Sequence, residues 1–255
     1  MSAEIPDSLR ERRLLFTVTT GRSGTQLLAR ALALFRDVDA RHEPKPTFSS
    51  ALRTVLAAPE TAREFWLEHK LPAIARSRRP VYAETSHLFC KGFLESLLAL
   101  GLRPELVHLR RDPRAVARSL LAMGTVPGRT FRGVKYYLSP GDANYLPVPR
   151  LGERAFSDYQ LCYWYCLEVE QRARAYSRLG LVLHAVELEE LSAAGGIAAL
   201  GRRLALGGMR ALGGLRAARL AHSPLNSRPD KKRPIDLSAA QMEREERQVR
   251  EWAAP

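Results

Sequence analysis

The chain has 255 residues, of which 45% are apolar, so it is long enough for one well-buried domain and short for two. It carries 40 Lys and Arg against 27 Asp and Glu, and the net charge of +13 favours anionic partners. Uncharged stretches fall well short of the ~20 residues that a membrane helix needs, and three cysteines do not indicate a disulfide framework. The polar N-terminus has no apolar signal core, and we expect a cytoplasmic protein.

Strand-like runs alternate with helical patterns along the chain. The expected strands are 14–20, 37–41, 80–85, 105–110 and 181–187, and the expected helices lie at 25–35, across 47–76, and at 91–100, 113–123 and 154–178. This alternation predicts an α/β fold of three layers, α/β/α, whose central parallel sheet has about five strands. We expect a single domain over residues 1–255. Ligands of such sheets bind beyond the carboxyl ends of the strands, so residues directly after each strand are site candidates.

Two segments interrupt this alternation. Residues 124–152 are rich in Gly, Pro, Tyr and Arg, and a long loop of this kind is typical of a lid or a binding loop. Residues 192–223 contain no acidic residue and many glycines. They indicate a loosely packed pair of helices. A basic helix on a membrane surface is the alternative, which the glycines disfavour.

The first strand runs into TTGRSGTQLL, a turn of small residues followed by an amphipathic helix. Gly21 and Gly24 permit a tight turn, and the backbone N–H groups that follow face outward at a helix start, where the helix dipole favours an anion. Ser23 and Thr25 add hydroxyl donors, and Arg22 adds a guanidinium. A Walker A loop would have a lysine where Thr25 stands, to organise a metal-bound triphosphate. The loop therefore predicts a phosphate and a neighbouring anionic group held without a metal.

TTGRSGTQLL resembles the phosphosulfate loop of the sulfotransferases that use 3′-phosphoadenosine 5′-phosphosulfate (PAPS). That loop has a Lys or Arg, then Ser-Gly-Thr, then usually another Thr or Ser. The matching residues are Arg22, Ser23, Gly24 and Thr25, and Gln26 departs from the usual hydroxyl. The resemblance implies a P-loop-like fold and assigns all five residues to PAPS binding. It also implies that Arg22 acts on the sulfonate during transfer.

The run VHLRRDPRAVARSLL passes from a strand into a helix, with Asp112 as a good N-cap and Pro113 as a good first helical residue. It resembles the second PAPS motif of the same family, which has an Arg, a proline two residues on and a Ser eight residues on. Arg111 and Ser119 fit this pattern, and the resemblance implies that they bind the 3′-phosphate. Arg110 fits only with a shift of one residue. The resemblance covers the chain well to about residue 122.

Sulfuryl transfer to a hydroxyl needs a base for the acceptor proton. Glu43 follows the second strand in RHEPKP, a stretch where the tyrosylprotein and carbohydrate branches of the family have a glutamate base. His87 in ETSHLF resembles the histidine base of the small-molecule branch, although Glu84 replaces the lysine of that Lys-Thr-His stretch and Ser86 is inserted. Glu43 is the favoured base and His87 the alternative. An unreactive exposed carboxylate is the simplest other interpretation of Glu43.

The expected activity is transfer of a sulfuryl group from PAPS to a hydroxyl acceptor, with release of adenosine 3′,5′-bisphosphate, without a metal and without a nucleic-acid partner. The basic run 224–236 either covers the nucleotide or forms a solvated turn. A P-loop kinase or NTPase and a basic nucleic-acid-binding module remain alternatives, although the kinase lacks its lysine and the nucleic-acid-binding module lacks a recognised motif.

Cys162 and Cys166 are expected to be buried side chains rather than metal ligands. The acceptor stays open among sugars, phenols, peptides and lipids.

Overall fold

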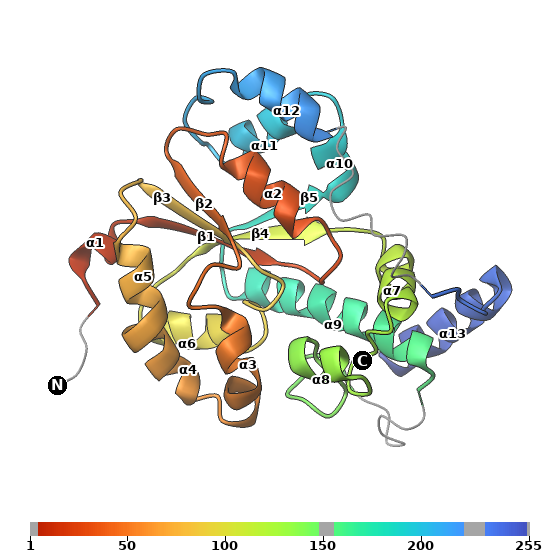
Figure 1. Cartoon of the computed structure of the whole chain (residues 1–255). Helices are drawn as coiled ribbons and strands as arrows, with labels where there is room; N and C mark the ends of the chain where they lie inside the picture. Colours follow the sequence, from red (N-terminus) through yellow and green to blue (C-terminus); the bar gives the residue numbers. More distant parts are fainter. Residues whose placement is uncertain (1–4, 148–155, 222–232, 254–255) are drawn as a thin grey trace.

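A computed structural model describes residues 5–147, 156–221 and 233–253 of the chain (Figure 1). Its centre is a sheet of five parallel strands in the order β2-β3-β1-β4-β5. The strands are β1 (Arg13–Val18), β2 (Val38–His42), β3 (Val81–Thr85), β4 (Glu105–Arg110) and β5 (Leu183–Glu187). Each lies where the sequence predicts a strand, and the α/β class is confirmed.

Helices cover both faces of the sheet and complete the three predicted layers (Figure 1). One face carries α2 (Thr25–Leu32), α10 (Leu188–Ser192), α11 (Gly196–Arg203) and α12 (Gly213–Ala221). The other face carries α1 (Asp7–Arg10), α3 (Phe48–Ala57), α4 (Thr61–Glu64), the π-helix η1 (Phe65–Lys70), α5 (Leu71–Ala75), α6 (Phe93–Ala99), α7 (Pro113–Ala122), α8 (Phe131–Tyr136), α9 (Asp158–Arg178) and α13 (Ala239–Trp252).

The central strand β1 contributes to two separate cores. Phe16 and Val18 belong to the large core under α3 to α9, whereas Leu15 belongs to the core under α2 with Leu28 and Leu32. Successive side chains of a strand point to opposite faces of the sheet. A central parallel strand is buried on both faces, which explains why its sequence is almost continuously apolar.

The segments that interrupt the alternation also contain helices. The long loop after α7 is described as far as residue 147 and contains the short helix α8, and the glycine-rich segment forms α11 and α12, the expected helical pair. Helix α13 is not among the elements expected from the sequence, although a capping box of Ser238 and Gln241 marks its start. Cys162 and Cys166 are buried on α9, as expected. Within the described ranges, no helix combines the length and apolar character that crossing a bilayer requires.

A buried ion pair joins the sheet to η1. Lys70 Nζ lies 2.7 Å from Glu84 Oε1, and the Tyr82 hydroxyl donates to the other carboxylate oxygen at 2.7 Å. Burial raises the pKa of Glu84 and lowers the pKa of Lys70, and the charge of each residue opposes the shift of the other. Because both side chains are almost fully enclosed, losing one of them leaves an uncompensated charge in the core.

We predict that Lys70→Met lowers the free energy of unfolding by about 3–5 kcal/mol, because Glu84 stays buried without its cation. Tyr82→Phe removes one hydrogen bond and should cost only about 0.5–1.5 kcal/mol. Replacing both members, Lys70→Met with Glu84→Leu, should recover much of the loss. Urea unfolding measures all three variants, and a Lys70→Met loss no larger than that of Tyr82→Phe would contradict the buried pair.

Candidate active site

The turn between β1 and α2 is left-handed at two residues. Arg22 has a φ of 71°, and Gly24, the N-cap residue of α2, has a φ of 89°. A positive φ is costly for a residue with a side chain, and such strain concentrates at functional sites. No side-chain hydrogen bond caps this end of α2. The first N–H groups of the helix lack intrahelical partners and are available to an anion.

The two predicted PAPS motifs meet at Arg22. Its Nε donates to Ser119 Oγ at 3.2 Å, and Arg111 Nη1 donates to the Arg22 carbonyl at 2.8 Å. Arg110 extends toward β5 instead, where its guanidinium lies 3.2 Å from Glu187. The structure therefore brings Arg111, rather than Arg110, to the β1–α2 loop. Asp112 is the N-cap of α7 and Pro113 its first residue, as predicted.

The remaining loop residues take different positions. Ser23 is buried, and its hydroxyl hydrogen-bonds to that of Thr20 within the loop. Thr25 and Gln26 begin α2 and are partly exposed. The Ser23 side chain thus shapes the loop, while the backbone of residues 24–26 lies at the uncapped helix start.

The two predicted bases lie side by side. His87 Nε2 is 3.9 Å from Glu43 Oε1, and Ser86 Oγ is 3.5 Å from the same oxygen. Glu43 is left-handed, with a φ of 44°, and its side chain is 36% exposed, whereas that of His87 is 14% exposed. Arg41 pairs with Asp39 rather than with Glu43. The two alternative bases that the sequence offers are therefore neighbours in the structure.

Threonine hydroxyls fix the segment that carries His87 against the loop. Thr17 Oγ accepts from the Ser86 N–H and donates to the Ser86 carbonyl, both at 2.9 Å. Thr85 Oγ donates to the Thr25 carbonyl at 3.0 Å. The ends of β1 and β3 are therefore tied to each other and to the start of α2. Glu84 lies one step back in the strand, inside the buried pair and outside the site.

Tyr137 lies between the β1–α2 loop and His87. Its ring centroid is 5.1 Å from that of His87, and a Cβ built on Gly21 would lie 2.6 Å from its hydroxyl. Arg53 holds the Tyr137 backbone by donating to its carbonyl at 2.6 Å. Burial raises the pKa of Tyr137, so the hydroxyl stays protonated and can donate a hydrogen bond.

A cavity of about 300 Å³ opens beside the loop. Apolar, aromatic and basic side chains and one threonine line it: Arg22, Leu120, Met123, Thr125, Arg132, Tyr136 and Tyr137. Several of them come from the long loop after α7. Such a wall, mostly apolar with a few placed polar groups, is typical of a small-molecule site.

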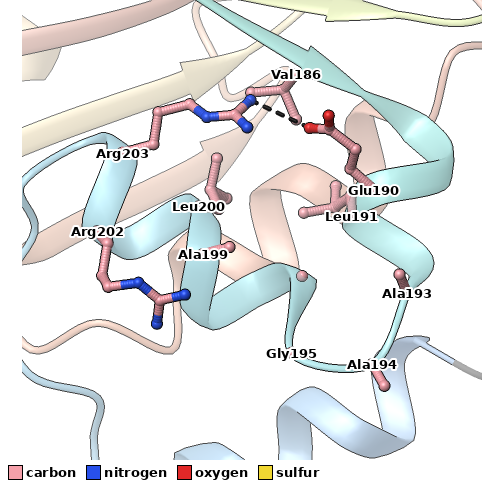
Figure 2. Close-up of a pocket in the computed structure, with 11 residues that line it drawn as sticks. Val186, Glu190, Leu191, Ala193, Ala194, Gly195, Ala199, Leu200, Arg202 and Arg203 are labelled. Atoms are coloured by element: carbon pink, nitrogen blue, oxygen red, sulfur yellow. Dashed lines mark hydrogen bonds and ion pairs between the residues drawn. The ribbon is translucent and has the colours of Figure 1, made fainter.

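A second cavity, of about 380 Å³, lies between α10 and α11 (Figure 2). Figure 2 shows the Arg203 guanidinium directed at Glu190, and their closest atoms are 3.1 Å apart. Most of the other wall residues are alanine, leucine and glycine. This cavity contains neither the strained loop nor the two bases, so we assign the candidate active site to the strand ends.

Sequence reasoning missed Lys91, which is fully buried directly behind His87. Its Nζ lies 3.1 Å from His87 Nδ1 and donates to the Tyr136 carbonyl at 2.6 Å. The available signal was a single lysine in the apolar run HLFCKG, four residues after the histidine.

The predicted nucleotide-covering loop falls mostly outside the described residues. Of its last part, the Arg233 N–H donates to the Ala122 carbonyl at 2.7 Å, at the end of α7. In the described part of the chain, no group of three or more His, Cys, Asp or Glu is arranged to hold a metal ion.

No protein-family model and no curated protein sequence matches the chain. Among solved structures, it resembles the sulfotransferase domain of the olefin synthase from Synechococcus PCC 7002, with a TM-score of 0.54 and 16% sequence identity. The alignment covers 98% of each chain. At this level of identity the likeness establishes the fold, so the chain has the fold of a sulfotransferase domain.

We predict that Gly21→Ala destabilises the protein by about 1–3 kcal/mol, the usual cost of overpacking, because the new methyl group meets the Tyr137 hydroxyl. Tyr137→Phe removes the atom nearest to the methyl group. A double-mutant cycle in urea should therefore show a smaller cost of Gly21→Ala in the Phe background. Additive losses would mean that Tyr137 does not press on the loop.

Proposed function

We propose that the protein is a sulfotransferase that moves a sulfuryl group from PAPS to a hydroxyl acceptor and releases adenosine 3′,5′-bisphosphate. One observation carries this proposal: the Arg22 guanidinium bonds to Ser119, while Arg111 bonds to the Arg22 carbonyl. The loop with Arg22 resembles a phosphosulfate loop, and the segment with Arg111 and Ser119 resembles a 3′-phosphate site. Their contact supports a ligand with anionic groups at two ends, and the fold likeness supports the same class.

The residues at the loop fit such a ligand. The N–H groups and dipole at the start of α2 suit the phosphosulfate, with backbone donors from Gly24, Thr25 and Gln26. Arg22 is proposed to lie against the sulfonate, and Arg111 with Ser119 against the 3′-phosphate. PAPS supplies an activated sulfuryl group with a single negative charge. Hydrogen-bond donors can stabilise that charge, so we propose that no metal is required.

Glu43 is the proposed base. The acceptor oxygen forms a new bond to sulfur, the bond between sulfur and the phosphate oxygen breaks, and the leaving bisphosphate keeps that electron pair. Glu43 takes the hydroxyl proton as the new bond forms. Burial, together with the charges of Lys91 and His42, keeps the pKa of His87 well below its ordinary value, so His87 is neutral beside Glu43.

The acceptor is proposed to bind in the cavity beside Arg22. Its aromatic wall supports a hydroxyl compound with an apolar body, and the exposed Arg132 at this wall favours an anionic substituent on that compound. Tyr137 lines the cavity and also contacts His87, so it connects the proposed acceptor site to the base.

Transfer of labelled sulfonate from PAPS tests the proposal directly. Pools of phenols, sugars, peptides and lipids are incubated with the protein and labelled PAPS in the presence of a chelator. We expect label in at least one pool, with the phenol pool as the first candidate. Failure to label any pool, or labelling that requires added magnesium, would contradict the proposal.

We predict that Arg111→Ala weakens binding of adenosine 3′,5′-bisphosphate by about 1.5–3 kcal/mol, the value of a charge-assisted contact. Binding of adenosine 5′-phosphate, which lacks the 3′-phosphate, should change much less. Arg110→Ala removes the neighbouring guanidinium and serves as the matched control, with little effect on either ligand. Calorimetry in which Arg111→Ala weakens both ligands equally would give Arg111 another role.

We predict that Glu43→Gln lowers turnover by roughly 10²–10⁴, the usual contribution of a positioned base, while nucleotide affinity stays nearly unchanged. Glutamine keeps the size and the carbonyl oxygen but cannot take the proton. His87→Asn is measured alongside and should retain more activity than Glu43→Gln. Normal turnover in Glu43→Gln together with an inactive His87→Asn would identify His87 as the base.

A further inference from the structure

Lys91 has an unusual set of neighbours for a buried cation. Its Nζ donates to the Tyr136 carbonyl at 2.6 Å and lies 3.1 Å from His87 Nδ1. The rings of Tyr137 and Tyr165 face it, each with its centroid 4.8 Å from the nitrogen. A carbonyl, an imidazole and two ring faces therefore surround the ammonium, and each of them can accept or stabilise a positive charge.

This contact determines which nitrogen of His87 holds the proton. An ammonium has only donors, so His87 Nδ1 must accept the hydrogen bond from Lys91 with its lone pair. A neutral imidazole with a bare Nδ1 has its proton on Nε2. That Nε2 is the atom 3.9 Å from Glu43 Oε1. His87 thus faces Glu43 with an N–H group and has no lone pair on that side.

We propose that Lys91 is a positioning residue that fixes the tautomer of His87, so that His87 presents an N–H donor to Glu43. The tautomer follows from the contacts of Lys91 in its ammonium form; only its consequence for catalysis rests on the proposed function. In that reaction His87 directs its N–H toward the Glu43 carboxylate, 3.9 Å away, and cannot itself take the acceptor proton at Nε2. Lys91 also ties this arrangement to the long loop, because its second hydrogen bond ends on the Tyr136 backbone.

The charge of Lys91 is consistent with this role. Burial lowers the pKa of Lys91 to about 7. At pH 6 the side chain is therefore mostly the ammonium, which can only donate, while His87 is still neutral because its own pKa is lower. Measurements of the tautomer are accordingly made at pH 6.

The experiment is nitrogen NMR of the full-length protein labelled at histidine, at pH 6 and without any nucleotide. The His87 signals are assigned by their loss in His87→Asn. We expect a bare Nδ1 and a protonated Nε2 in the wild type. Lys91→Met keeps the length of the side chain without its donor, and a protonated Nδ1 should then appear. Lys135→Met removes an exposed lysine from the neighbouring helix α8 and should leave the His87 signals unchanged.

Turnover provides the second readout. Lys91→Met should lower kcat by ~10–100-fold, by analogy with the loss of a hydrogen-bond partner that fixes the tautomer of a metal-bound histidine, with little change in the KM for PAPS. A wild-type His87 with its proton on Nδ1, or on both nitrogens, overturns the inference even if Lys91→Met does not fold. A lower kcat with an unchanged tautomer overturns it as well. The expected tautomer in a protein that transfers no sulfonate would contradict the proposed function and support the assignment of Lys91.

Discussion

The parallel register of β1 with its two neighbours is the constraint on which the candidate site depends. Phe16 pairs with Glu84 of β3, and Val18 pairs with His108 of β4, so all three strands end at the same edge. The β1–α2 loop, the segment with His87 and the start of α7 are therefore brought together. Thr17 fixes this arrangement with two hydrogen bonds to the Ser86 backbone. A slip of one residue in this register would turn every β1 side chain to the opposite face of the sheet and separate the loop from His87.

Backbone strain and buried charge occur where the proposed chemistry needs them. Arg22 and Glu43 are both left-handed without being glycines, and each lies in the loop that follows a strand at the carboxyl edge of the sheet. Behind them, Lys91 links His87 to the backbone of the long loop. The proposed base, its neighbour His87 and the backbone of the long loop therefore lie next to one another, with Lys91 in contact with both His87 and the loop.

The sequence predicts the fold well because its signals are local. The strands β1, β3 and β4 are largely apolar runs followed by small or polar residues, and the start of α7 is visible in Asp112 and Pro113. The two anion motifs are also local, and their contact follows from the topology. The sequence does not reveal that Glu43 and His87 are neighbours, because this depends on β2 pairing with β3. The choice of Arg111 over Arg110, by contrast, is already indicated by the spacing to Pro113 and Ser119, and the contact of Arg111 with the Arg22 carbonyl agrees with it.

Lys91 and Lys70 show why a buried lysine is not predicted from the sequence. Both are lysines in the core, and each is stabilised by groups that are distant in the sequence. Helical periodicity and composition treat lysine as a surface residue, so only long-range packing identifies these two as buried. The capping box of α13 is different, because Ser238 and Gln241 are a local signal that marks this helix in the sequence itself.

We propose that the β1–α2 loop and α7 bind a 3′-phosphorylated nucleotide without a metal. Thermal and calorimetric titration of the wild-type protein with adenosine 3′,5′-bisphosphate, in a chelator, tests it most directly. We expect saturable binding, with a stabilisation of about 2.7 kcal/mol at a ligand concentration of 100 times Kd. Stabilisation by ATP that needs magnesium, or by DNA in a salt-sensitive manner, without any response to the bisphosphate, would contradict it.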